Sequence, residues 1–119
     1  MKYKNILITG GAGFVGSNLA VSLKRDYPDL KIVALDNLKR RGSELNLARL
    51  KSGGISFLHG DIRSREDLEE SGSFDLIIEC SAEPSVLSGF DGAPDYVLNT
   101  NLVGSINCFE LARKREADI

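Results

Sequence analysis

The residues with the clearest chemical use are four glycines within a stretch of seven residues, between an apolar segment and a helix-like one. They are Gly10, Gly11, Gly13 and Gly16. Their spacing fits two forms of the glycine-rich turn that binds dinucleotides, Gly-x-Gly-x-x-Gly and Gly-x-x-Gly-x-x-Gly. Glycine is needed there because a missing Cβ lets a pyrophosphate approach the backbone and lets the next helix pack closely on the strand. The amides of Phe14 and Val15, at the positive end of that helix, would then bind the phosphates.

An acidic residue stands at the end of the next apolar segment, in the position that such a site requires. This residue is Asp36, twenty residues beyond Gly16. Its carboxylate can accept hydrogen bonds from both hydroxyls of an adenosine ribose, whereas a 2′-phosphate would be repelled. NAD is therefore favoured over NADP, although Arg40 and Arg41 could accommodate a 2′-phosphate. The alternative for Asp36 is a plain turn or helix-capping role.

The elements that must position these residues follow from the hydropathy pattern. Short apolar runs predict strands at residues 5–9, 31–36, 55–60 and 74–80. The runs are nearly continuous, as is typical of strands covered on both faces. A helical segment follows each strand, and Pro28 ends the first helix because proline disfavours helix at the residue before it.

The boundaries of the other helices come from capping and breaking residues. A capping Ser43 opens the second helix, which ends at Gly53, and a capping Ser64 opens the third. The last and longest helix is expected from Pro94 to about Lys114. It carries an apolar stripe formed by Leu98, Leu102, Ile106 and Phe109.

The alternation of strands and helices predicts an α/β fold of the Rossmann type, with a parallel sheet of about four strands in the order 3-2-1-4 and helices on both faces. A doubly wound nucleotide-binding sheet usually has about six strands. We therefore expect residues 1–119 to be the N-terminal part of an NAD(P)-binding domain. The remaining strands, the substrate domain and the catalytic helix are expected to be missing from it.

Composition excludes several classes of protein. A net charge of −2 gives no electrostatic basis for binding nucleic acid or an anionic membrane, and the basic cluster at residues 39–41 is too short to change this. The sequence contains no membrane-length apolar run and no signal-peptide pattern, so a cytoplasmic location is expected. Cys80 and Cys108 lie in apolar segments without metal-ligand spacing, which predicts free thiols and no metal site.

Four stretches, TGGAGFVGSNLA, LDNL, HGDIR and NTNLVGSINCFELAR, resemble the extended short-chain dehydrogenase/reductase family. This family includes the NAD-dependent nucleotide-sugar epimerases and dehydratases. The match runs over essentially the whole chain but over only about the first third of a family member. The stretch DNLKRRGSELNLARL further resembles the CDP-paratose 2-epimerase (CDP-tyvelose epimerase) branch.

The resemblance implies which residues would bind the cofactor. The pyrophosphate would contact Gly10, Gly13, Phe14, Val15 and Gly16. The adenosine ribose would contact Asp36 and Asn37, and the adenine would contact Asp61 and Ile62. The ribose on the nicotinamide side would contact Cys80, Ser81 and Ala82, with Asn99 near the cofactor. Asn101 matches an asparagine of the long helix that stabilises the active-site sheet in the family.

Two glutamates depart from the family pattern. Glu79 stands where a histidine is frequent, and Glu83 stands where a glutamine is common. Glu83 begins a loop that faces the substrate sugar in relatives, where a carboxylate could bind sugar hydroxyls or could simply be solvated. Neither glutamate is assigned a catalytic role.

Catalysis in the family needs a serine or threonine and a Tyr-x-x-x-Lys helix, in which the tyrosinate takes a proton while hydride passes to the nicotinamide. The single match here, Tyr27 to Lys31, is a chance match because Pro28 prevents the helical turn that would align the pair. No catalytic residue is therefore assigned. His59 is expected to be a partly buried residue at the end of the third strand.

The resulting functional hypothesis is the NAD-binding portion of a nucleotide-sugar epimerase or dehydratase that works by transient oxidation of the sugar and is inactive as this chain alone. One alternative is a stand-alone NAD-binding or sensor module, and another is an S-adenosylmethionine-dependent methyltransferase. Self-association is expected through the edge of the fourth strand or through the last helix, which family members often use for dimers.

Overall fold

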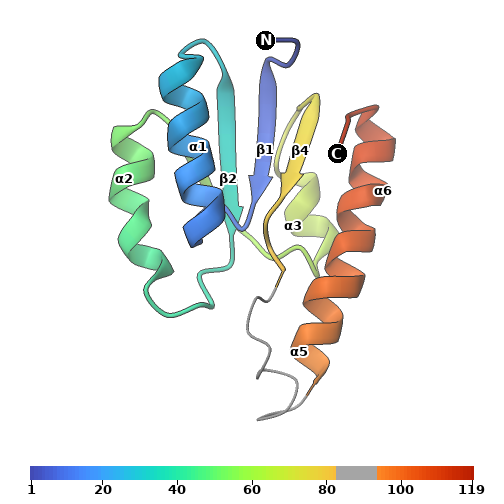
Figure 1. The fold of residues 1–119 in the computed structure, drawn as a ribbon. Helices are drawn as coiled ribbons and strands as arrows, with labels where there is room; N and C mark the ends of the chain where they lie inside the picture. The colour runs from blue at the N-terminus through green and yellow to red at the C-terminus, as the bar shows by residue number, and fades with distance from the viewer. Residues whose placement is uncertain (83–93) are drawn as a thin grey trace.

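Four parallel strands form the centre of the molecule, in the order β3-β2-β1-β4. Figure 1 shows β2, β1 and β4 side by side between the helices. The computed structural model describes residues 1–82 and 94–119. The strands are β1 (Asn5–Thr9), β2 (Lys31–Asp36), β3 (Ser56–His59) and β4 (Leu76–Glu79). The predicted strand order and the bounds of β1 and β2 are confirmed, whereas β3 and β4 are shorter than their apolar runs.

Helices connect and flank the strands. They are α1 (Phe14–Asp26), the 3₁₀-helix η1 (Ser43–Asn46), α2 (Leu47–Ser52), α3 (Arg65–Glu69), α5 (Asp95–Leu98), the π-helix η2 (Asn99–Gly104) and α6 (Ser105–Arg115). Helix α1 ends before Tyr27 and Pro28, as expected. None of the helices within the described ranges is long and apolar enough to cross a membrane.

The two predicted helix caps have different outcomes. Ser64 caps α3, since its side chain accepts a hydrogen bond from the amide of Asp67 at 3.3 Å. The capping role of Ser43 is wrong, because Ser43 lies inside η1 and its hydroxyl donates to the carbonyl of Arg40 at 2.7 Å. Gly42, with φ of 95°, makes the left-handed turn that begins η1 instead.

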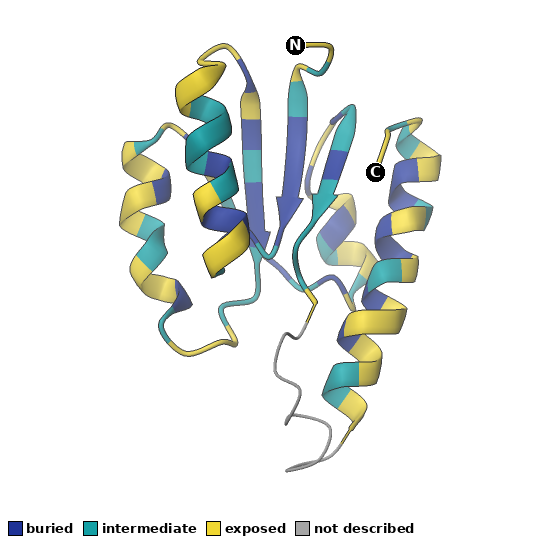
Figure 2. Cartoon of the chain, in the orientation of Figure 1, coloured by how far each residue is buried: buried dark blue, intermediate teal, exposed yellow. Residues whose placement is uncertain are grey.

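Two hydrophobic layers cover the sheet, one on each face. Side chains of Ile6 and Ile8 pack with residues of α1 and α2, while Leu7 packs with residues of α3 and α6. Because both faces are covered, residues 6–9 of β1 are all buried, and Figure 2 shows the strand as a nearly continuous dark segment. The continuous apolar sequence of β1 thus reflects its central position.

The last helix differs from its expected form in two ways. The segment from Asp95 to Arg115 is interrupted by the π-helix η2, and the predicted apolar stripe faces outward rather than the core. Small residues face the core at four-residue intervals, namely Thr100, Gly104, Cys108 and Ala112, together with the larger Asn107 and Leu111. Small residues let the helix lie close to its neighbours, and a Cβ on Gly104 would stand only 2.4 Å from Cδ1 of Ile62. The four residues of the predicted stripe are therefore left on the outer face.

The two ends of the chain meet beside β4. The amide of Ile77 donates to the carbonyl of Asp118 at 2.9 Å, and the amide of Asp118 donates to the carbonyl of Asp75 at 3.0 Å. The hydroxyl of Tyr3 donates to Oδ2 of Asp118 at 2.6 Å. These contacts join the segment before β1 to the segment after α6.

Candidate functional site

A cavity of about 530 Å³ lies at the carboxyl ends of the strands, where the strand order reverses between β1 and β4. In open α/β sheets, ligands bind in the crevice at this position. All of the predicted cofactor-binding residues except Gly16 and Asn99 line the cavity. Its other lining residues are Leu35, Arg40, Ser43, Gly60, Glu79, Tyr96 and Thr100.

The glycine turn forms one wall of this cavity, between β1 and α1. Gly10 has φ of 66°, and a Cβ there would stand 2.2 Å from the carbonyl oxygen of Cys80. A Cβ on Gly16 would stand 2.2 Å from the carbonyl oxygen of Gly10. At Gly13 the nearest atom, the same oxygen of Gly10, would be 3.2 Å away. The fold itself therefore excludes side chains at Gly10 and Gly16, whereas Gly13 is less confined.

The first turn of α1 presents backbone amides toward the cavity. The first hydrogen bond of the helix runs from the amide of Ser17 to the carbonyl of Gly13 at 3.0 Å, so the amides of residues 14–16 precede the helical ladder. Phe14 and Val15 line the cavity and are 84% and 63% exposed. Such a helix start can bind an anionic group through its amides and the positive end of the helix dipole.

Asp36 both shapes the turn after β2 and faces the cavity. Its Oδ2 accepts a hydrogen bond from the amide of Ala12 at 3.0 Å, and its Oδ1 accepts from the amide of Leu38 at 2.8 Å. Leu38 has a left-handed backbone with φ of 58°. Asp36 therefore does stabilise the turn, which was the alternative role considered for it. The remaining lone pairs of its carboxylate can still accept further hydrogen bonds.

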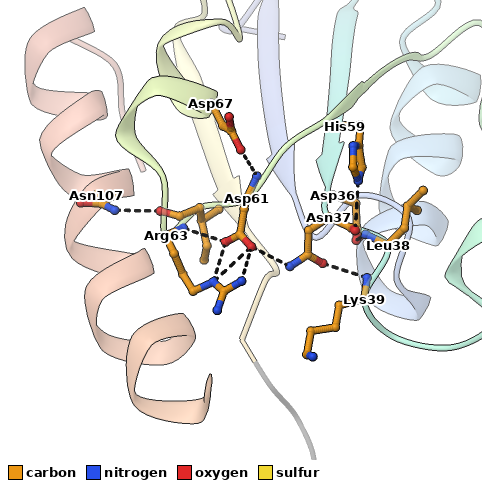
Figure 3. A network of polar contacts seen from close by, with 10 residues as sticks. Asp36, Asn37, Leu38, Lys39, His59, Asp61, Arg63, Asp67 and Asn107 are labelled. Atoms are coloured by element: carbon orange, nitrogen blue, oxygen red, sulfur yellow. Dashed lines mark hydrogen bonds and ion pairs between the residues drawn. The ribbon is translucent and has the colours of Figure 1, made fainter. Parts of the chain in front are cut away.

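A polar network fixes the next acidic residue, Asp61, on the same wall (Figure 3). Oδ2 of Asp61 accepts hydrogen bonds from Nδ2 of Asn37 at 3.0 Å and from a terminal guanidinium nitrogen of Arg63 at 2.6 Å. The backbone amide of Asp61 donates to Oδ2 of Asp67 at 2.9 Å. The hydrogen bonds from Arg63 and Asn37 outweigh burial and lower the pKa of Asp61 to about 2. Asp61 is therefore a fixed carboxylate that joins the ends of β2 and β3.

Ile62 is held by the last helix. Its carbonyl accepts a hydrogen bond from Nδ2 of the buried Asn107 at 2.8 Å, and Oδ1 of Asn107 accepts from Nε of Arg65 at 3.1 Å. Asn107 and its bond to the β3–α3 turn are visible in Figure 3. The sequence did not indicate Asn107 because a single asparagine on a helix has no distinctive spacing.

Tyr96 on α5 completes this side of the cavity. The Nζ atom of Lys39 lies 4.6 Å from the centroid of the Tyr96 ring, and Cζ of Arg63 lies 5.0 Å from it. Cations at such distances are attracted to an aromatic face. Tyr96 therefore connects α5 to the loops that follow β2 and β3.

Residues 6–118 match a family described as the NAD dependent epimerase/dehydratase family. The chain belongs to this family. A dTDP-glucose 4,6-dehydratase from Mycobacterium tuberculosis is 33% identical over 92% of this chain and 33% of its own length. A CDP-paratose 2-epimerase from Salmonella typhi is 34% identical over 92% of this chain and 32% of its own length. The chain thus spans about a third of these relatives.

The solved structures agree with this assignment. A dTDP-glucose 4,6-dehydratase from Bacillus anthracis, determined in complex with NAD, superposes with a TM-score of 0.78 and 28% identity over 97% of this chain and 35% of that one. Relatives with different reactions match at nearly the same identity. The comparisons therefore establish the epimerase/dehydratase family and not one branch of it.

Within this epimerase/dehydratase fold, Thr100 is a lining residue that the sequence did not indicate. Thr100 is 4% exposed, and its Oγ1 is the buried side-chain atom that has no hydrogen-bond partner in the described part of the chain. The neighbouring Asn99 was expected near the cofactor, but it is exposed and lines a separate depression with Asp61 and Arg63. Asn101 is also exposed, and its carbonyl accepts a hydrogen bond from Ser105.

Glu79 ends β4 on the opposite side of the cavity from Asp61. Its Oε1 accepts hydrogen bonds from the amide of Ser81 at 2.7 Å and from the hydroxyl of Thr9 at 3.5 Å. Its Oε2 accepts from the hydroxyl of Ser105 at 3.2 Å. Glu79 therefore links β1, β4 and α6. Glu83 and the loop that it begins lie outside the described residues.

The two thiols are free, as the sequence predicted. Burial, with a smaller contribution from the charge of Glu79, raises the pKa of Cys108 to about 12. The same causes raise the pKa of Cys80, which lines the cavity. Neither group is a thiolate at neutral pH. Among residues 1–82 and 94–119, no group of three potential metal ligands is present.

The ionisable residues Tyr27, Lys31 and His59 do not line the cavity. Tyr27 follows α1 and Lys31 begins β2, so both lie at the end of the sheet that is opposite the cavity. This position supports the interpretation of the Tyr-x-x-x-Lys spacing as a chance match. His59 ends β3 as predicted but is exposed rather than partly buried, with Nε2 at 3.1 Å from the carbonyl of Asn37.

Proposed function

We propose that this chain binds NAD in the cavity at the β1–β4 reversal, as the cofactor-binding portion of a nucleotide-sugar epimerase or dehydratase. The observation that carries this proposal is the glycine turn followed by the exposed amides of α1. Gly10 and Gly16 are required by the protein's own packing, whereas Gly13 has no close contact except the oxygen 3.2 Å away. A glycine at such a position leaves space for a pyrophosphate to approach the backbone.

The other lining residues fit the remaining parts of NAD. Asp36 and Asn37 would bind the adenosine ribose, and Asp61 and Ile62 would border the adenine. The strand reversal would direct the nicotinamide half toward Cys80, Ser81 and Ala82 beyond β4. The hydroxyl of Thr100, which has no hydrogen-bond partner among the described residues, supports this proposal, because a buried polar atom without a partner costs about 1–3 kcal/mol unless a ligand bonds to it.

In the proposed reaction, NAD accepts a hydride from a sugar carbon and later returns it. The residues of this chain would bind and orient the cofactor. The tyrosine–lysine pair that moves the proton in this family is absent from the 119 residues, so we expect no turnover by this chain alone.

For the substrate, we propose a CDP-sugar oxidised at C2, as in the 2-epimerase branch. The stretch from Asp36 to Leu50 supports this branch, as does the 34% identity to the Salmonella typhi CDP-paratose 2-epimerase. Addition of the CDP-sugar to a complete enzyme, with the configuration at C2 followed by nuclear magnetic resonance, tests the assignment. Conversion to a 4-keto-6-deoxy sugar would contradict it.

Calorimetric titration of the chain with NAD, NADP and S-adenosylmethionine tests the cofactor. We expect NAD to bind more tightly than NADP, because the Asp36 carboxylate opposes a 2′-phosphate even with Arg40 on the same cavity wall. Asp36→Asn is expected to weaken NAD binding about tenfold or more, since each charged hydrogen bond contributes about 1.5–3 kcal/mol. The matched control Asp29→Asn, in the exposed loop after α1, should leave the affinity unchanged. Absence of NAD binding by the unmodified chain would overturn the proposed function.

We also propose that the chain self-associates through α6 and the free edge of β4. Beside this edge, Leu76, Ile78, Phe109 and Ile119 line an apolar depression. Within the described residues, β4 pairs with β1 on one side and has only the bridge between Leu76 and Asp118 on the other. An open strand edge beside exposed apolar side chains favours pairing with another copy.

A further inference from the structure

Glu79, the half-buried last residue of β4, lines both the cavity and the apolar depression beside the edge of β4. We propose that its charge makes this site bind the oxidised, positively charged nicotinamide more tightly than the reduced one. This inference rests on the proposed NAD site and concerns the redox form that the site prefers.

The position of Glu79 follows from the topology of the sheet. Asp36 ends β2 and Asp61 follows β3, so the adenosine half of a dinucleotide would lie on that side of β1. The other half would cross to the β4 side, where Glu79 lines the cavity together with Ser81 and Thr100. Of the acidic residues that line the described cavity, Glu79 is therefore the one on the nicotinamide side.

The carboxylate of Glu79 is fixed in this position. Oε1 accepts a hydrogen bond from the amide of Ser81 at 2.7 Å. Oε2 lies 3.2 Å from the hydroxyl of Ser105, which shares its proton with the carbonyl of Asn101 at 2.9 Å. These partners come from the loop after β4 and from the start of α6, so rotation of the side chain would break one bond or the other. A fixed charge acts on a ligand without a cost of reorganisation.

In the described part of the chain, no neighbouring cation neutralises the charge of Glu79. None of the ion pairs formed among residues 1–82 and 94–119 includes Glu79. Its hydrogen-bond donors, an amide and two hydroxyls, are neutral. The field of the carboxylate therefore reaches the cavity that Glu79 lines.

This field distinguishes the two redox forms of the cofactor. The oxidised nicotinamide ring carries one positive charge, and addition of a hydride removes that charge. Attraction to Glu79 therefore acts on NAD⁺ and not on the ring of NADH. A tenfold preference corresponds to a reduction potential about 30 mV lower for the bound two-electron couple. Bound NADH would then be a better hydride donor, which suits a reaction in which the hydride must be returned.

The test compares three ligands on the chain and its variants by calorimetry and NADH fluorescence. The ligands are NAD⁺, NADH and ADP-ribose, which lacks the nicotinamide. We expect Glu79→Gln to reduce the preference for NAD⁺ over NADH by about threefold to tenfold, while ADP-ribose affinity stays constant. Glu79→Asp, which keeps the charge, should retain most of the preference. Glu66→Gln, an exposed site on α3, is the control for loss of one negative charge.

Three other outcomes would overturn the inference about Glu79, and the first of them would also overturn the proposed NAD site. If the unmodified chain binds none of the three ligands, the proposed NAD site fails and this inference fails with it. If the chain binds NAD⁺ and NADH but Glu79→Gln leaves their ratio unchanged, only the inference about Glu79 is overturned. If Glu79→Gln weakens all three ligands equally, Glu79 has a structural role and the electrostatic inference is also overturned.

Discussion

Gly13 and Gly16 occupy the same turn but have different surroundings. A Cβ at residue 16 would collide with the carbonyl oxygen of Gly10 at 2.2 Å, so Gly16→Ala is expected to lower the free energy of unfolding by about 1–3 kcal/mol. Gly13→Ala should change it by less than about 1 kcal/mol, since residue 13 is an N-cap with an ordinary φ of −76°.

Gly13→Ala should nevertheless weaken NAD binding about tenfold or more, because the added methyl group would occupy space near the pyrophosphate. Urea unfolding and calorimetric titration of both variants measure the two effects. Equal destabilisation by the two substitutions, or undiminished NAD affinity of Gly13→Ala, would contradict this explanation of the turn.

Asp61 predicts a pH dependence of stability. Arg63 and Asn37 lower its pKa to about 2 in the folded state, from the ordinary 3.8. Its contribution is fully present above the unfolded pKa and is lost as the pH falls through the folded value. Asp61→Asn should therefore lower the free energy of unfolding by about 1–2 kcal/mol near pH 7, after allowance for partial exposure, and by progressively less below about pH 4.

Urea unfolding of Asp61→Asn across this pH range provides the measurement. Glu110→Gln removes a half-exposed carboxylate on α6 and should show a smaller pH-dependent difference. If Asp61→Asn lowers the free energy of unfolding by the same amount from neutral to acidic pH, the contribution of Asp61 to stability does not depend on its ionisation.

The sequence predicted residues on the loops better than residues on the last helix. Asp36 and Asp61 each follow a clear strand signal, and both line the cavity. Thr100 and Tyr96 were not indicated, because a residue on a helix is placed by the rotation of that helix about its axis. That rotation depends on contacts such as Gly104 against Ile62, which no local pattern reveals.

At the scale of elements, α6 positions the turn that follows β3. Asn107 is 5% exposed, and its amide nitrogen donates to the carbonyl of Ile62 at 2.8 Å. Asn107→Ala removes this donor from a buried carbonyl and should lower the free energy of unfolding by about 1–3 kcal/mol. Arg113→Ala, on the exposed side of the same helix, removes only a surface ion pair and should cost less than about 1 kcal/mol. Thermal and urea unfolding measure the stability of both variants. Equal losses of stability in Asn107→Ala and Arg113→Ala would contradict the positioning role of Asn107.

The strands were predicted more accurately than the helices for a physical reason. The central strand β1 is buried on both faces, so its whole sequence is apolar and its ends are sharp. Helix α2 follows a 3₁₀ turn that Gly42 begins, and the last helix contains a π-helical segment. An average period of 3.6 residues cannot distinguish these tighter and wider turns from α-helix.

At the scale of the whole molecule, the exposed apolar face of α6 predicts self-association. Leu102 and Phe109 are each 58% exposed, although apolar residues of this size are usually covered. We expect light scattering at about 100 µM to show a dimer or larger species for the unmodified chain, as for other apolar patches of this kind.

The double variant Leu102→Ser/Phe109→Ser should be monomeric under the same conditions. Leu45→Ser is the matched control, because Leu45 is 79% exposed but lies on η1, away from α6. A monomeric unmodified chain at this concentration would contradict the self-association proposal.

The contact between Tyr3 and Asp118 has a consequence for the order of folding. The hydrogen bond joins residues separated by 115 positions, so it closes nearly the whole chain into one loop. The entropy cost of closure grows with loop length, and β1 and β4 must pair before these two side chains can meet. The bond should therefore form after the folding transition state. In stopped-flow experiments, Tyr3→Phe should accelerate unfolding and leave the refolding rate unchanged.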